Sequence, residues 1–216
     1  MKRAPSVIQS QLTRRDLALA TLLAVGLGTL FGCLSAGLSL WLTFVPGLLC
    51  SWGLLLWMYR ARTALPSPRR FLPLFMGLLA VQCLHFAEEY LTGFRIQFPL
   101  LYGGAPYSAE LFVVFNMAAY ALFSVACLLS LHTRLRFLLL PVLFFVVYGA
   151  IGNAISHSLW SLLAGRYFPG LYTAQLYWVM GPLALQGLLG RWRATLVFIG
   201  LWGALLTALL THFTPS

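Results

Sequence analysis

The sequence predicts an all-α protein, a polytopic transmembrane helical bundle of about seven helices. Hydrophobic residues make up 61% of the 216 residues and charged residues 8%, about a third of the charged fraction of a soluble domain. Apolar runs of about twenty residues, the length that crosses a bilayer as a helix, recur along the chain. The polar stretches between these runs are too short to form a separate soluble domain.

The apolar runs place the expected helices in chain order. We expect helices at residues 17–38, 41–59, 71–92, 109–131, 137–164, 174–189 and 194–211. Pro46 and Gly47 leave the junction of the first two helices open, and with it the helix count over residues 36–47. The fifth run is long enough to tilt or to extend past the lipid, whereas the sixth is short and contains Gly181 and Pro182.

The basic residues predict the orientation of the bundle. The chain has 14 Lys and Arg residues, and under this helix assignment all of them except Arg95 and Arg166 fall on one side. Because cytoplasmic loops carry the excess of Lys and Arg, we expect the N-terminus in the cytoplasm and the C-terminus outside. The expected division is a cytoplasmic N-terminal tail (1–16), a single transmembrane helical domain (17–212) and a short C-terminal tail (213–216).

The net charge of +10 does not indicate a nucleic-acid partner, because no basic stripe with interleaved aromatic residues is present. The four cysteines lie in apolar runs without a CxxC pair, which is typical of small buried side chains. We therefore expect neither disulfides nor a cysteine metal site. The expected partners are membrane lipids, including a lipid or membrane-embedded substrate, and the sequence does not predict an oligomeric state.

The acidic residues carry the main functional signal. The chain has four Asp and Glu residues, and Glu88 and Glu89 are adjacent in an apolar run, one helical turn after His85. This spacing places all three side chains on one face of a helix. Ionisable groups inside a membrane are costly and mark functional sites. Two adjacent carboxylates there need a cation, a proton or strong donors; a purely structural hydrogen-bond cluster is the alternative.

A second polar set lies on the fifth expected helix, where Asn153, Ser156 and His157 are close in helical projection. Counted from the cytoplasmic side, His85 and His157 lie roughly 21 and 30 Å along their helices. Both sets therefore fall in the outer half of the membrane, and we expect them to meet.

Further polar residues lie near the same level and are candidates for supporting the site or contacting a substrate. Glu110 and Asn116 belong to the fourth expected helix, and Arg95 and Arg166 to loops. Either arginine is suited to neutralise the carboxylates or to bind an anionic head group. Interfacial positions explain Glu110 and the arginines equally well, and Asn116 is suited to join two helices by a hydrogen bond.

Three short motifs occur in order: His85-Phe-Ala-Glu88-Glu89, Asn153-Ala-Ile-Ser-His157 and Pro169-Gly170. They resemble the motifs of the HXXEE-motif family of bacterial integral membrane proteins, which has an HxxEE signature, an NxxxH signature and a following PG. The resemblance covers roughly residues 71–173. It implies a multi-pass protein of the bacterial inner (plasma) membrane, and a metal-bound or hydrolytic role is suggested for that family from its motifs alone.

Pro169 and Gly170 by themselves predict the turn between the fifth and sixth helices, with proline at position i+1. A lid over the polar site is the functional alternative for this turn. Proline and glycine in a loop need no function to explain them, so the structural interpretation is preferred.

The preferred function is an intramembrane metal-dependent enzyme that is hydrolytic. His and Glu one helical turn apart bind a divalent metal in HxxEH metallopeptidases. By this analogy the expected metal ligands are His85, Glu89 and His157. Glu88 is then the general base, and Asn153 orients a ligand or stabilises an oxyanion. Two histidines and one carboxylate suit zinc and non-haem iron alike, so the metal stays open.

Two other functions remain as alternatives. A metal-free acid–base enzyme, an isomerase or cyclase, could use a buried Glu and a neighbouring His on a lipid or isoprenoid substrate. A transporter or proton relay could use the same groups, although no matching acidic residue or histidine lies in the cytoplasmic half of the third or fifth expected helix. A haem held between the two histidines would leave both glutamates unexplained.

Overall fold

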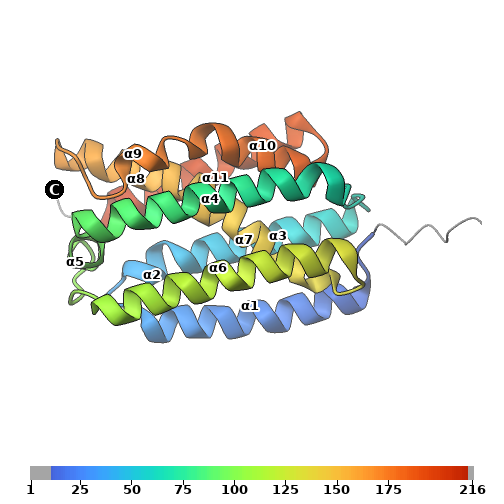
Figure 1. Cartoon of the computed structure of the whole chain (residues 1–216), viewed down its shortest axis with the longest axis horizontal. Coiled ribbons are helices and arrows are strands. Elements are labelled where there is room, and N and C mark those ends of the chain that lie inside the picture. Colours follow the sequence, from blue (N-terminus) through green and yellow to red (C-terminus); the bar gives the residue numbers. More distant parts are fainter. Residues whose placement is uncertain (1–10, 214–216) are drawn as a thin grey trace, which may run out of the picture.

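The computed structural model describes residues 11–213, and these form helices and no strands. The all-α fold class is therefore confirmed. The long helices run side by side in one bundle (Figure 1). In chain order the helices are α1 (Arg14–Leu34), α2 (Ser39–Leu42), α3 (Phe44–Arg60), α4 (Pro68–Thr92), α5 (Phe94–Leu100), α6 (Ala109–His132), η1 (Arg136–Leu138), α7 (Leu139–Phe144), η2 (Phe145–Gly152), α8 (Asn153–Ala164), α9 (Leu171–Ala174), α10 (Tyr177–Leu189) and α11 (Trp192–Phe213).

Six helical stretches among the described residues are long and apolar enough to cross a membrane. They correspond to six of the seven expected helices, so a multi-pass bundle is supported. The remaining expected segment, 174–189, contains α10 and only the last residue of α9; α10 has 13 residues, fewer than the roughly 20 that span a bilayer. The start of α1 and the end of α11 lie at opposite ends of the bundle (Figure 1). This agrees with an odd number of passes, and the count of seven stays a prediction.

The basic residues gather at the end of the bundle where α1 begins. Lys2 and Arg3 lie outside the described residues. The start of α1, the α3–α4 connection, the end of α6 and the α10–α11 connection all lie at this end (Figure 1). These segments contain Arg14, Arg15, Arg60, Arg62, Arg69, Arg70, Arg134, Arg136, Arg191 and Arg193. Arg95 and Arg166 lie at the opposite end, which we call the far end; that it faces outward stays a prediction.

Two of the four acidic residues stabilise the beginnings of helices. Asp16 accepts hydrogen bonds from the backbone N–H and the hydroxyl of Thr13, and the Thr13 hydroxyl accepts one from the Asp16 N–H. This capping box begins α1. Glu110 lies exposed in the first turn of α6, where a negative charge is favoured by the helix dipole. Only Glu88 and Glu89 remain for a site inside the bundle.

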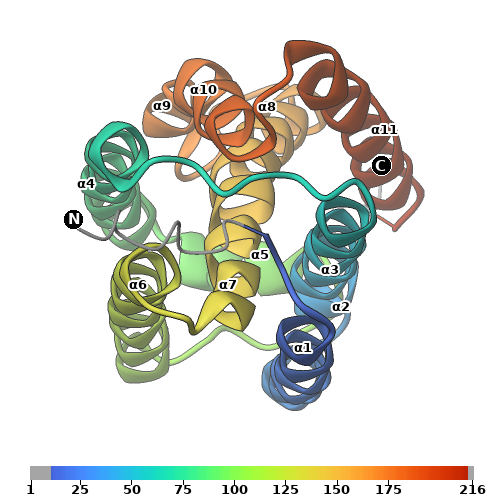
Figure 2. The same cartoon turned by 90° about the vertical axis from the view of Figure 1, so that its right-hand side faces the viewer.

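The stretch expected as one α-helix over 137–164 is more irregular. It consists of the 3₁₀ turn η1, the α-helix α7, the π-helix η2 and the α-helix α8. This stretch passes through the middle of the bundle (Figure 2), and most of it is buried. The wider turns of η2 rotate α8 relative to α7, so the direction of Asn153 and His157 could not be derived from residues 137–152. π-helical turns often occur next to functional sites.

Small residues let neighbouring helices approach η2 closely. A Cβ atom on Gly47 of α3 would lie 2.7 Å from Cβ of Tyr148. A Cβ atom on Gly181 of α10 would lie 2.7 Å from Cγ1 of Ile151. Glycine is therefore required for this packing, as is common between helices in membranes. α3 and α10 thus hold η2 in place from two sides.

We expect Gly47→Ala to destabilise the protein, because the added methyl group meets a Cβ atom that cannot move without its backbone. Overpacking of this kind costs about 1–3 kcal/mol. The control is Gly53→Ala on the same helix, where a Cβ atom has nothing within 4 Å and alanine favours the helix. Thermal unfolding in detergent measures both, and equal midpoints for the two variants would contradict the close packing of α3 on η2.

Candidate metal centre

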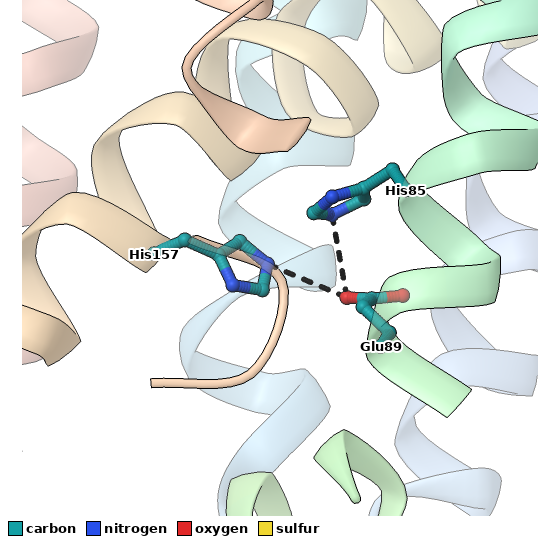
Figure 3. A group of neighbouring side chains, drawn as sticks. All are labelled: His85, Glu89 and His157. Carbon is teal, nitrogen blue, oxygen red and sulfur yellow. Dashed lines mark ion pairs between the residues drawn. The ribbon is translucent and has the colours of Figure 1, made fainter. Parts of the chain in front are cut away.

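Three side chains from two helices meet inside the far half of the bundle. His85 and Glu89 lie one turn apart on α4, and His157 lies on α8. Both imidazole rings direct Nε2 toward Oε1 of Glu89 (Figure 3), at 3.4 Å from His85 and 3.3 Å from His157. The three ligand atoms lie within 4.8 Å of one another, and all three residues are buried. The predicted metal ligands therefore form a cluster that could hold a metal ion.

The other nitrogen of each ring shows where its proton is. Nδ1 of His157 lies 2.7 Å from the Pro169 carbonyl oxygen. A carbonyl only accepts hydrogen bonds, so Nδ1 donates. Nδ1 of His85 lies 2.8 Å from Oγ1 of Thr173, whose own hydroxyl donates to Glu88; Thr173 must therefore accept from His85. A neutral ring with its proton on Nδ1 has a lone pair and no proton at Nε2.

In that form each ring presents a nitrogen lone pair to the same Glu89 oxygen, Oε1. Neither Nε2 has a hydrogen-bond partner among residues 11–213. A charge-assisted N–H···O bond would be about 2.7–2.9 Å long, shorter than both observed separations. Two atoms bound to one tetrahedral zinc at 2.0–2.1 Å lie about 3.4 Å apart. The two observed Nε2–Oε1 separations match this value. The His–Glu distances therefore fit ligands of a shared cation better than hydrogen-bonded partners.

Glu88 is directed to α9 and not to the two Nε2 atoms. Its carboxylate accepts hydrogen bonds from the Tyr167 hydroxyl, the N–H groups of Tyr172 and Thr173, and the Thr173 hydroxyl. Partial burial raises the pKa of the Tyr167 hydroxyl, so this group remains a donor. A carboxylate surrounded by donors alone is ionised, and it satisfies free N–H groups at the start of α9. The base role of Glu88 stays a prediction; its contacts favour positioning.

The turn before α9 covers the cluster. The Leu171 N–H donates to the Phe168 carbonyl, and Gly170 adopts φ +89° and ψ −4°. These values are those of position i+2 in a type II turn, so Pro169 occupies i+1 as predicted. A Cβ atom on Gly170 would lie 2.6 Å from Cε1 of His157 and 3.0 Å from Cε1 of His85. The turn thus packs on both rings, as the lid alternative requires, and its Pro169 carbonyl orients one of them.

A cavity of about 360 Å³ borders the cluster. Its wall consists mainly of apolar side chains from α1, α6, α7 and η2, and it includes Glu89. Among the predicted site residues, Asn153 and Asn116 also line it. The side-chain amide of Asn153 forms no hydrogen bond with the other described residues, so it is available to a molecule in the cavity. Asn116 donates to the Phe112 carbonyl and accepts from the Tyr120 hydroxyl.

The structure does not bring the remaining predicted residues to the cluster. The Arg95 guanidinium donates to the Tyr107 carbonyl and ties α5 to the following loop. Arg166 and Glu110 are exposed, and within residues 11–213 neither arginine forms an ion pair with a carboxylate. Ser156 is buried on α8, and its hydroxyl has no hydrogen-bond partner in the same part of the chain.

Sequence reasoning missed a row of polar side chains beside the cluster. The Tyr177 hydroxyl donates to Gln82, the Gln82 amide donates to Tyr120, and the Tyr120 hydroxyl donates to Asn116. Gln82 precedes His85 by three residues and Glu89 by seven, so it lies on the same face of α4. That spacing was a signal available in the sequence. Thr173 and Tyr167 gave no comparable signal.

We expect Gly170→Ala to lower the unfolding midpoint more than Gly165→Ala does. Both glycines have positive φ, +89° and +60°, so alanine costs about 1–2 kcal/mol of backbone strain at either position. Only at Gly170 does the methyl group also collide with two imidazole rings, which adds about 1–3 kcal/mol; at Gly165 nothing lies within 4 Å. Equal midpoints in thermal unfolding would show that the turn does not pack on the rings.

Comparisons with known proteins give no match to a family model, to a curated protein or to a solved structure. The resemblance to the HXXEE-motif family thus stays a prediction, and the geometry of the site has to support any functional proposal.

Proposed function

We propose that this protein is a metal-dependent membrane enzyme with hydrolytic activity. One observation carries the proposal: two buried imidazole Nε2 atoms, neither with a hydrogen-bond partner among the described residues, converge on one buried carboxylate oxygen. Buried acceptors without a donor or cation between them are strongly destabilising. A divalent cation bound by His85, Glu89 and His157 removes this cost. Two histidines and a carboxylate suit zinc or non-haem iron.

Three protein ligands leave a coordination position for water or a substrate oxygen, and a bound divalent metal makes such a water nucleophilic at neutral pH. The protein then has to admit a substrate to this position. Glu89 belongs both to the cluster and to the cavity wall, so the cavity is the space in which a substrate would meet the site. Asn153 on the same wall is suited to donate a hydrogen bond to a carbonyl or phosphoryl oxygen.

The residues around the ligands fix the orientation of both rings. The Pro169 carbonyl accepts a hydrogen bond from His157. The Thr173 hydroxyl accepts one from His85 and donates one to Glu88. Hydrogen bonds of this kind determine which ring nitrogen faces a metal, and they raise the basicity of the ligand. Such an arrangement supports a metal-binding role for the cluster. The acid–base alternative needs a proton between His and Glu89, and the observed separations are longer than that hydrogen bond.

We expect purified wild-type protein to contain a stoichiometric divalent metal that is lost in His85→Ala and in His157→Ala. Each substitution removes one of three ligands. His132→Ala is the control, because His132 is exposed at the last residue of α6, at the end of the bundle away from the cluster. Elemental analysis of untagged protein, with folding checked by circular dichroism, measures the metal. A folded wild type without metal, or full metal content in both ligand variants, would reject the proposal and favour the acid–base enzyme.

We expect Thr173→Val to weaken metal affinity about 10–100-fold, the usual effect of removing a group that orients a ligand. Valine keeps the shape of threonine but removes the acceptor for His85 and the donor to Glu88. Thr173→Ser keeps the hydroxyl and should retain wild-type affinity. Competition with a chelator of known affinity measures both variants, and equal affinities would show that Thr173 does not orient His85.

A further inference from the structure

We propose that the substrate is a membrane lipid whose chain enters the cavity sideways, through an opening between α1 and α6. This inference rests on the proposed function and names the substrate class of the same site. It commits to an amphiphile with an apolar chain and a hydrolysable carbonyl or phosphoryl group where chain and head group join.

The cavity reaches the outer surface of the bundle between α1 and α6. Leu30 of α1 and Val114 of α6 both line the cavity, and their side chains are 45% and 59% exposed. α1 packs mainly on α3, whereas α6 packs on α4 and α7. The two helices stand apart at the side of the bundle (Figure 2). Because both are apolar and long enough to span a membrane, the opening between them faces lipid tails.

The position of the cavity along the bundle fits one leaflet. On α6 its lining extends from Leu111, near the far end, to Phe123, which is about 18 Å along a helix. On α1 it extends from Leu27 to the last residue of the helix, Leu34. One leaflet contributes about 15 Å of hydrocarbon. A lipid chain can therefore lie in the cavity parallel to the neighbouring lipid tails.

The distribution of polar groups gives the orientation of the chain. Glu89 lies near the end of α4 at the far end of the bundle, while Phe123, Phe144 and Phe145 form the deep wall of the cavity. A lipid with its chain against these rings would have the polar end beside Glu89. The cavity volume of about 360 Å³ falls within the range of ligand pockets, about 300–1,000 Å³. A water-soluble substrate would need neither the apolar depth nor the sideways opening.

Photolabelling in lipid nanodiscs tests this inference. The probes are a phosphatidylglycerol with a diazirine in the middle of one acyl chain and an isoprenoid phosphate with a diazirine in its chain. Labelled residues are mapped by mass spectrometry. We expect labels on cavity-lining residues such as Phe31 and Phe115, from one or both probes, and their ratio distinguishes an acyl from an isoprenoid chain. Labels confined to lipid-facing residues such as Leu201, which is 69% exposed, would overturn the inference.

A pair of alanines on α6 provides the matched control. Ala119 lines the cavity, whereas Ala121 is exposed and does not. We expect Ala119→Trp to abolish cavity labelling and Ala121→Trp to leave it unchanged. Ala118→Trp, at an exposed lining position, replaces Ala119→Trp if that variant fails to fold. Equal labelling of a folded lining variant and the Ala121 control would also overturn the inference.

The outcome separates the two proposals. Cavity labelling in a wild type that contains no metal would leave the lipid site standing and reject the metal enzyme. A wild type with stoichiometric metal and no cavity labelling would support the metal enzyme and reject the lipid site. His85→Ala should lose metal and keep the label, because the chain binds against apolar walls that this substitution does not alter.

Discussion

The burial of Glu89 between two imidazole rings is the constraint on which the site depends. Glu89 is 5% exposed and both histidines are fully buried, so bulk solvent contributes little to their stabilisation. Each ring donates a hydrogen bond from Nδ1 to an acceptor, which directs its Nε2 toward the same Glu89 oxygen. In the proposed site a divalent cation at the centre of the cluster removes the cost of burying these groups. α4, α8 and the Pro169–Gly170 turn must all be in place before this geometry exists.

The adjacent glutamates perform different tasks because their environments differ. Glu89 faces two ring acceptors, whereas Glu88 is surrounded by donors from the turn and the start of α9. Glu88 thereby attaches α9 to α4 and fixes Thr173, which in turn fixes His85. A mutation of either glutamate would disturb the same cluster, but only Glu89 contributes an atom to it. In the proposed site the HxxEE motif combines two ligands, His85 and Glu89, with Glu88, which positions His85 through Thr173.

Much of the fold and part of the site could be predicted from the sequence. Apolar runs located the long helices, the spacing of His85 and Glu89 placed both on one helix face, and the matching depth of His157 indicated that it would meet them. The π-helix η2 could not be predicted, because its apolar sequence would suit an α-helix equally well; in the structure it packs closely against α3 at Gly47 and against α10 at Gly181. Thr173 was missed because it lies between two expected helices, where a threonine shows no pattern. Only the Pro169–Gly170 turn brings Thr173 and α9 against α4.

The row of polar groups in the bundle explains how an apolar cavity can border a polar cluster. Gln82, Tyr120 and Asn116 satisfy one another in sequence, and the row ends on the Phe112 carbonyl. Their hydrogen-bonding capacity is largely used within the wall, so an apolar chain beside them leaves few donors unpaired. Asn153 and Glu89 differ, since the described residues give the Asn153 side chain no hydrogen bond and Glu89 faces the cluster. The groups of the wall left to act on a polar molecule are therefore Glu89 and Asn153, while the rest of the wall suits hydrocarbon.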